Sequence, residues 1–373
     1  MSSGLQDVVA TTSALCYLDG ERGVLAYCGY DIHDLAQSAT FEEVCFLLWH
    51  RRLPTRAELG DLNSQLAAGR ALPDAIHRLM RSLPAGDGMD ALRTLTSALA
   101  HYDPDVADQS PQANYRKAVR LTAQMGTLVA TYGRMVQGGG AIAPDPALGQ
   151  SANFLYMLTG ERPDPLSVRA FDVGLILHAD HELNASTFAA RVTAATLSDV
   201  HSAIVSGIGT LKGPLHGGAN ADVMRMLLAI GEDADDDRAE ATVRAKLARK
   251  EKIPGFGHRV YRTEDPRATH LRRLSKQLGE RAGHPRWFQM SQRIEAVVHA
   301  EKGLFPNVDF YSASAYHAMG MPLDLYTPIF AVSRVSGWTA HVLEQLANNR
   351  LIRPRAEYTG PEYPQVFVPR DLR

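Results

Sequence analysis

One short strand-like pattern at the N-terminus, followed by helical patterns almost to the C-terminus, most constrains this fold. Residues 9–29 alternate like two strands around the turn Asp19-Gly20-Glu21-Arg22-Gly23. From Asp31 onward, apolar residues recur near every 3.6 positions, as in amphipathic helices. We therefore predict an almost all-α protein with one small N-terminal β-hairpin.

Glycine, proline and polar segments separate the expected helices. One lies between Asp31 and Pro54, and the others span residues 56–68, 73–83, 90–101, 115–136, 152–160, 167–178, 187–205, 219–230, 238–249, 267–278, 289–302, 312–320 and 327–349. Asn184 or Ser186 is placed to cap the helix at 187, and Thr327 the helix that begins with Pro328. The proline-rich segment 353–373 has too few apolar residues to fold alone. We expect it to lie over another surface, such as that of a second subunit.

Bulk properties are those of a globular chain. The length of 373 residues suggests about two domains, and 45% apolar with 21% charged residues is ordinary. No apolar run approaches the ~20 residues that span a bilayer, and the N-terminus has no secretory signal pattern. Three cysteines, not in metal-ligand spacing, predict buried thiols in a reducing cytoplasm. A net charge of −2 argues against nucleic acid as a partner.

Two histidines lie in separate glycine-flanked turns. The first turn is Gly213-Pro214-Leu215-His216-Gly217-Gly218, and the second is Pro254-Gly255-Phe256-Gly257-His258. Glycine allows a ligand to approach the backbone closely, so we interpret both histidines as displayed. From Arg244 to Lys276 there are eleven Lys/Arg and three Asp/Glu. Part of this basic stretch fits a solvated helix face, but the arginines near His258 predict an anionic ligand with carboxylates or phosphates.

Several kinds of site do not fit the residues. His178, His181, His201 and His216 lack zinc-protease spacing, and no Cys-x-x-Cys is present. Neither a Gly-x-Ser-x-Gly elbow nor a full dinucleotide fingerprint occurs. Acid–base chemistry at a carbon beside a carbonyl remains. A carboxylate such as Asp309 would take the proton, one neutral histidine would stabilise the enolate oxygen, and another would polarise the second carbonyl. Spacing alone leaves structural roles for these residues open.

The sequence closely resembles the citrate synthase family in its short bacterial form, over nearly the whole chain. The resemblance rests on Tyr17-Leu18-Asp19-Gly20, His178-Ala179-Asp180-His181-Glu182-Leu183-Asn184-Ala185-Ser186-Thr187, Gly213-Pro214-Leu215-His216-Gly217-Gly218-Ala219-Asn220, Gly255-Phe256-Gly257-His258-Arg259-Val260-Tyr261-Arg262, Asp265-Pro266-Arg267, Asn307-Val308-Asp309, Ser333-Arg334 and Arg353-Pro354-Arg355. It implies a multihelical homodimer whose cleft closes on substrate. Residues 1–215 and 318–373 would form the large dimerisation domain, and residues 216–317 the small domain with the CoA-binding and catalytic residues.

The resemblance also implies residue roles. Asp309 would remove a methyl proton from acetyl-CoA, His216 would stabilise the enol, and His258 would polarise the ketone of oxaloacetate and protonate the new alkoxide. Water would then hydrolyse the citryl thioester, without a metal or other cofactor. The oxaloacetate carboxylates would be held by His181, Arg267, Arg334 and, from the partner subunit, Arg353. CoA would be bound by Arg262, Lys302 and the backbone of Ile253, Pro254, Gly255, Phe256 and Gly257.

Alternatives remain at this stage. A 2-methylcitrate synthase, which uses propionyl-CoA, would share every residue named above, and dual activity is open because one methylene changes binding by only ~1–3 kcal/mol. A non-catalytic homologue and a metal hydrolase are less favoured. The hairpin begins within about ten residues of Met1, so we do not expect the N-terminal NADH-binding segment of longer bacterial forms, or inhibition by NADH.

Overall fold

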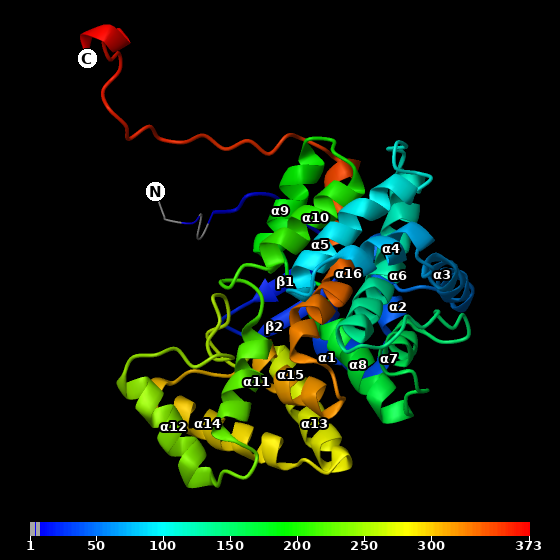
Figure 1. Ribbon diagram of the computed structural model, residues 1–373, viewed down its shortest axis with the longest axis vertical. Coiled ribbons are helices and arrows are strands. Elements are labelled where there is room, and N and C mark those ends of the chain that lie inside the picture. The colour runs from blue at the N-terminus through cyan, green and yellow to red at the C-terminus, as the bar shows by residue number, and fades with distance from the viewer. Residues whose placement is uncertain (1–3, 5–7) are drawn as a thin grey trace.

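The computed structural model describes residue 4 and residues 8–373, which are mostly helical (Figure 1). Strands β1 (Cys16–Asp19), β2 (Val24–Tyr27) and β3 (Tyr30–Asp31) form an antiparallel sheet in that order. The helices are α1 (Ile32–Ser38), α2 (Phe41–His50), α3 (Arg56–Gly69), α4 (Asp74–Ser82), α5 (Gly88–Leu99), α6 (Pro111–Val136), α7 (Gln150–Thr159), α8 (Pro165–His178), α9 (Ala185–Ala195), α10 (Val200–Leu211), α11 (Ala219–Ile230), α12 (Asp236–Ala248), α13 (Pro266–Ala282), α14 (Arg286–Lys302), α15 (Val308–Ala318) and α16 (Tyr326–Ala347).

The predicted hairpin is confirmed, and a short third strand is added to it. Cys16 pairs with Tyr27 and Asp19 with Val24, around a turn in which Gly23 has φ +65°. The hydroxyl of Tyr27 lies 2.9 Å from the carbonyl oxygen of Asp180 and 3.1 Å from that of Ile176. The sheet is thereby fixed to the end of α8, beside the segment that carries His181.

Helix α16 is the centre of the main core. It packs against α6, α9, α10, α8 and α2, and its side chains from Tyr326 to Val342 are almost all buried. A helix that is buried on all sides needs apolar or small residues around its whole circumference. α16 meets this requirement except at a few polar positions, and one of these, Arg334, belongs to the predicted site.

A second group of helices, α11 to α15, lies in the lower part of Figure 1. In this group α13 packs on α15, α12 on α14 and α11 on α15. α13 also contacts α1 and α8, so the group is joined closely to the rest of the protein. The boundaries 1–215, 216–317 and 318–373 stay a prediction.

Four details of the predicted secondary structure were wrong. The one helix expected between Asp31 and Pro54 is two helices, α1 and α2, and Thr40 caps the second. The single helix expected over 187–205 is two helices, α9 and α10. They are separated at Leu197, which has φ +66°, and Asp199 caps the second one. The helix expected at 312–320 begins at Val308 with Asn307 as its cap, so Asp309 lies in its first turn. Thr327 caps nothing, because a 3-10 turn (Leu323–Leu325) runs directly into α16. Asn184 caps α9 as predicted.

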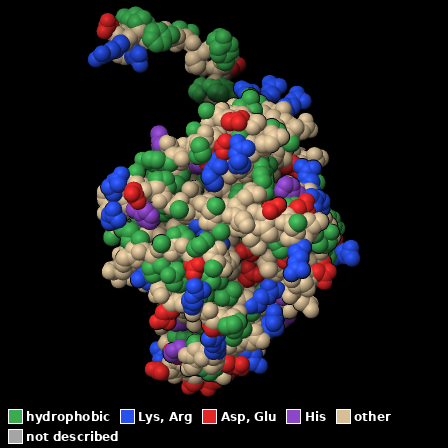
Figure 2. All heavy atoms as spheres, turned by 90° about the vertical axis from the view of Figure 1, so that its right-hand side faces the viewer, with side chains coloured by type: hydrophobic (Ala, Val, Ile, Leu, Met, Phe, Trp, Pro, Cys, Tyr) green, Lys and Arg blue, Asp and Glu red, His purple; other side chains and the backbone are tan. Residues whose placement is uncertain are grey.

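The C-terminal segment beyond Arg353 extends away from the body without packing on it (Figures 1 and 2). Tyr363, Val366 and Phe367 on this segment are exposed apolar residues. The three cysteines are free thiols, although only Cys45 is fully buried. Among the described residues, no helix has both the length and the apolar character needed to cross a membrane.

Candidate active site

His216 lies in a tight turn between α10 and α11. Its N–H donates to the carbonyl oxygen of Gly213 at 2.9 Å. A Cβ on Gly217 would lie 2.2 Å from the carbonyl oxygen of Leu211, and Gly218 has φ +89°. Only glycine fits both positions without moving the backbone, which explains the Gly-Gly after His216.

The imidazole of His216 is held by Ser186 at the start of α9. Its Nε2 lies 2.8 Å from the Ser186 hydroxyl and accepts from the Ser186 backbone N–H at 3.3 Å. A backbone N–H can only donate, so Nε2 carries a lone pair. Neutral His216 therefore holds its proton on Nδ1, and the Nδ1–H is available as a donor to a ligand.

His258 has the opposite arrangement of its ring nitrogens. Its Nδ1 accepts from the backbone N–H of Val260 at 3.0 Å and of Tyr261 at 3.3 Å. The proton of neutral His258 is then on Nε2. The ring lies 5.2 Å from that of His181 between centroids, and His181 Nε2 is 3.1 Å from the Tyr261 hydroxyl. The two glycine-flanked turns thus present two neutral N–H donors.

Asp309 is attached to the His258 loop through Asn307. The N–H of Asn307 donates to the Gly255 carbonyl at 2.9 Å, and its side-chain N–H to the Gly257 carbonyl at 2.9 Å. The Asn307 side-chain oxygen accepts from the Asp309 N–H at 3.0 Å. No hydrogen bond to the Asp309 carboxylate is found within residues 8–373, so both of its oxygens remain available.

Two buried arginines lie beside these groups. Arg267 forms a bidentate pair with Asp265, from Nε at 2.9 Å and Nη2 at 2.8 Å. Arg334 donates through Nε to the His178 carbonyl at 2.7 Å, and its guanidinium lies over the Phe330 ring. In the described part of the chain, Nη1 of Arg267 and both Nη atoms of Arg334 have no hydrogen-bond partner. These donors could bind carboxylates, since guanidinium matches carboxylate oxygens in pairs.

Burial sets the protonation of the site at neutral pH. Burial, with Arg334 adding to it, lowers the pKa of His216 to about 4. Burial and then Arg267 lower the pKa of His258 to about 4. Burial raises the pKa of Asp309 to about 6, although Arg267 opposes this shift. Near pH 7 the site therefore holds two neutral imidazoles and one ionised carboxylate of raised basicity.

Most of the predicted residues lie close enough together for the charges of Arg267 and Arg334 to shift the pKa values of the others. Arg267 and Arg334 influence the titration of both Asp309 and His181, Arg334 influences that of His216, and Arg267 that of His258. The arrangement can therefore hold an anion, remove a proton from carbon and stabilise a developing oxyanion.

The remaining predicted residues lie outside this cluster. Arg262 is exposed, and its backbone N–H donates to the Gly20 carbonyl at 2.9 Å. Lys302 is exposed at the end of α14. Ile253–Gly257 pass beside the segment that leads to Asp309, through a bridge between Phe256 and Pro306. Arg353 lines a separate cavity of about 860 Å³, together with N-terminal residues between Val8 and Ala14.

Sequence reasoning missed several residues that support the site. Asp265 and Asn307 stood in the recognised motifs without a role, although an Asp two positions before a predicted Arg ligand is a usable signal. Ser186 was predicted only as a possible helix cap. Trp338, whose indole N–H donates to the Ser186 hydroxyl at 3.1 Å, had no predicted role. Nothing in the local sequence connects Ser186 or Trp338 with His216.

Known proteins are similar to this chain in sequence over nearly its whole length. The model of the family described as citrate synthase, C-terminal domain, matches residues 4–355. Citrate synthase 2 of Bacillus subtilis is 55% identical over 372 residues, which are 99% of this chain and 98% of the relative. The chain belongs to the citrate synthase family.

Solved structures of the citrate synthase family agree with this membership. The crystal structure of citrate synthase from Pyrobaculum aerophilum is 41% identical with a TM-score of 0.92, over 99% of this chain and 95% of that one. A ternary complex of the Thermoplasma acidophilum enzyme with carboxymethyl coenzyme A and oxaloacetate is 32% identical with a TM-score of 0.92, over 100% of this chain and 99% of that one.

A relative with a different name is also similar to this chain. A 2-methylcitrate synthase of Mycobacterium tuberculosis is 44% identical over 97% of this chain and 91% of the relative.

Proposed function

We propose that this protein condenses acetyl-CoA with oxaloacetate and water, giving citrate and CoA. The observation that carries the proposal is the joint presence of Asp309, two neutral histidines with defined N–H donors, and two arginines with free guanidinium nitrogens. A Claisen-type condensation needs a base, two oxyanion donors and anchors for a dianion, and this set supplies each of them.

The first step is removal of a methyl proton from acetyl-CoA by the Asp309 carboxylate. The Nδ1–H of His216 donates to the thioester oxygen as negative charge develops there. Because His216 is neutral, it stabilises the enol without protonating the thioester beforehand. A positioned base contributes roughly 10²–10⁴-fold and one oxyanion donor about 10²–10³-fold.

The second step is attack of the enol carbon on the ketone of oxaloacetate. The Nε2–H of His258 polarises that ketone and gives its proton to the new alkoxide. His181 and the free donors of Arg267 and Arg334 hold the carboxylates, so that the ketone faces the enol. Water then hydrolyses the citryl thioester, and neither a metal nor another cofactor takes part.

We further propose that Arg262, Lys302 and the backbone of Ile253–Gly257 bind CoA, and that residues 216–317 form a small domain that carries these groups. The exposed segment from Arg353 suits a homodimer in which Arg353 reaches the partner's oxaloacetate. The Thermoplasma acidophilum complex supports this choice of substrates, since that relative holds oxaloacetate together with a carboxymethyl analogue of coenzyme A.

The test is an assay of CoA release with oxaloacetate and each acyl-CoA in turn, with and without a chelator. We expect turnover with acetyl-CoA that the chelator does not change. Relatives named 2-methylcitrate synthase make propionyl-CoA the necessary comparison. A kcat/KM for propionyl-CoA well above that for acetyl-CoA would replace the proposed substrate, and absence of CoA release with both would reject the proposed reaction.

A further inference from the structure

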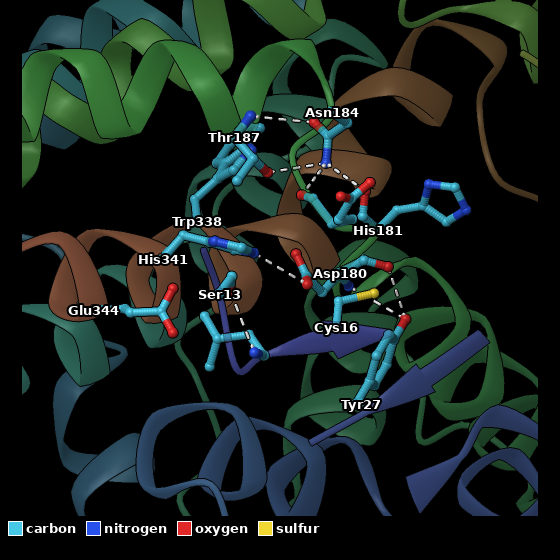
Figure 3. A network of polar contacts seen from close by, with 12 residues as sticks. Ser13, Cys16, Tyr27, Asp180, His181, Asn184, Thr187, Trp338, His341 and Glu344 are labelled. Carbon is cyan, nitrogen blue, oxygen red and sulfur yellow. Dashed lines mark hydrogen bonds and ion pairs between the residues drawn. The ribbon is translucent and has the colours of Figure 1, made fainter. Parts of the chain in front are cut away.

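Trp338 lies behind the residue that holds His216. It is fully buried on α16, one helical turn after Arg334. Its indole Nε1–H donates to the Ser186 hydroxyl oxygen at 3.1 Å. Figure 3 shows Trp338 and His341 of α16 facing the segment from Asp180 to Thr187. The packing is close, because a Cβ on Gly207 would lie 3.1 Å from the indole ring.

The hydrogen bonds around Ser186 show why an indole is needed there. The Ser186 hydroxyl has one proton and two acceptors nearby, Asn184 Oδ1 at 2.7 Å and His216 Nε2 at 2.8 Å. The Asn184 oxygen is engaged as the cap of α9, where it also accepts from the Thr187 N–H at 3.1 Å. With the His216 proton on Nδ1, neither of these two acceptor atoms can donate to the hydroxyl oxygen. The indole N–H, which can only donate, is the group that does so.

Loss of the indole donor would leave the buried Ser186 oxygen without a donor, which is costly. The nearest replacement is the imidazole of His216, if its proton moves from Nδ1 to Nε2. His216 would then present a lone pair to the thioester oxygen instead of an N–H. The identity of residue 338 therefore bears on the tautomer of a histidine that it does not contact directly.

We propose that Trp338 is a positioning residue for the condensation: through Ser186, its indole N–H keeps His216 in the tautomer whose Nδ1–H faces the substrate. This inference rests on the proposed function, because it takes a donor from His216 to be required. It adds a requirement on α16 that is separate from anion binding by Arg334.

The test compares Trp338→Phe with Trp49→Phe. Trp49 makes the equivalent bond, from Nε1 to the Thr339 hydroxyl at 2.9 Å, but is not joined to Ser186. We expect Trp338→Phe to lower kcat about 5- to 30-fold, the range of a hydrogen bond worth 1–2 kcal/mol. The KM for oxaloacetate should stay within about twofold, because the arginines and His181 keep their contacts. Trp49→Phe should leave kcat nearly unchanged.

A double-mutant cycle with Ser186→Ala separates this role from packing. Without the Ser186 oxygen there is no demand for a donor, so adding Trp338→Phe should lower kcat no further. Independent losses in the two variants would overturn the proposal, as would a normal kcat in Trp338→Phe. If Phe prevents folding, 3-benzothienylalanine at position 338 keeps the ring shape without the N–H and should give the same loss. Absence of CoA release by the unchanged protein would instead reject the proposed function, so the two failures are distinguishable.

Discussion

Two features of its surroundings act on the pKa of Asp309 in opposite directions. It lies in the first turn of α15, where the helix dipole favours an anion. Burial nevertheless prevails and raises its pKa to about 6. A base of this pKa is ionised at neutral pH yet more basic than an exposed aspartate. His216 and His258, with pKa values of about 4, are neutral at the same pH.

The pH dependence of turnover should follow Asp309 on its acid side. Because the base must be ionised, kcat/KM for acetyl-CoA should rise about tenfold per pH unit below pH 6 and level off above it. Neutral His216 and His258 add no further change between pH 5 and 8. The measurement is kcat/KM from pH 4.5 to 8.5. A profile with no inflection near pH 6 would be inconsistent with Asp309 as the free-enzyme base.

Asp309 should also lower the stability of the substrate-free protein at neutral pH. Its folded-state pKa of about 6 lies above the ordinary value of 3.8, so its ionisation opposes folding, and this cost appears as pH rises from about 4 to 6. In Asp309→Asn that cost is absent. Urea unfolding at pH 8 should show the variant about 1–3 kcal/mol more stable, with a smaller difference at pH 4.5. If Asp309→Asn and the unchanged protein were equally stable at both pH values, this account would be contradicted. Turnover by Asp309→Asn should be nearly abolished.

At the scale of elements, the hairpin turn and the loop after His258 are fitted to each other. A Cβ on Gly20 would lie 2.2 Å from the Val260 carbonyl oxygen, and a Cβ on Gly23 would lie 2.8 Å from the Thr263 side chain. The Gly20 carbonyl accepts from the Arg262 N–H at 2.9 Å. The N-terminal sheet thus supports the segment that presents His258, through backbone contacts that only glycine permits.

Gly20→Ala should disturb this contact, because the new methyl group meets backbone and not a flexible side chain. We expect a loss of about 1–3 kcal/mol in the free energy of unfolding, the range of a forced overpacking, and a higher KM for acetyl-CoA. The control is Gly60→Ala in α3, where an added Cβ meets no atom within 4 Å. That change should be neutral or stabilise by about 0.5–1 kcal/mol. If Gly20→Ala behaved like the control, the fit between turn and loop would not matter.

At the scale of the whole molecule, the segment from Arg353 to Arg373 has apolar side chains that a single chain leaves uncovered. Beyond Pro354 it carries exposed Tyr358, Tyr363, Val366 and Phe367, and it extends away from the rest of the described chain. Apolar side chains on an extended segment gain stability only when another surface covers them. This supports the proposed homodimer, which sedimentation of the protein would test.

The role of Arg353 across the dimer can be tested by mixing two inactive variants. Arg353→Ala lacks the arginine of the C-terminal segment, and Asp309→Asn lacks the proposed base. If Arg353 acts in the partner's site, half of a randomly reassociated mixture is heterodimer with one complete site of two, so about a quarter of wild-type activity should return. If Arg353 acts within its own chain, neither site of the heterodimer is complete. Activity that stays at background in reassociated dimers would therefore exclude a role in the partner's site.

Much of this protein was determined by the sequence alone. The 3.6-residue periodicity and one glycine turn predicted a helical protein with a single hairpin, and the displayed histidines and the arginines were visible as local patterns. Such features depend on the order of neighbouring residues, so the sequence carries them directly. The local sequence placed some helix boundaries wrongly, for example at Leu197 between α9 and α10 and at the start of α15. At these positions, local patterns favoured more than one boundary.

Other features were decided only by the tertiary structure. The protonation of His216, His258 and Asp309 depends on burial among residues from distant segments. The tautomer of His216 depends on Ser186, 30 residues away along the chain, and that of His258 on how its loop folds back. The link from Trp338 to Ser186 spans 152 residues. Desolvation and hydrogen-bond direction are properties of the packed chain, which is why the sequence could suggest the proposed catalytic groups but not their protonation.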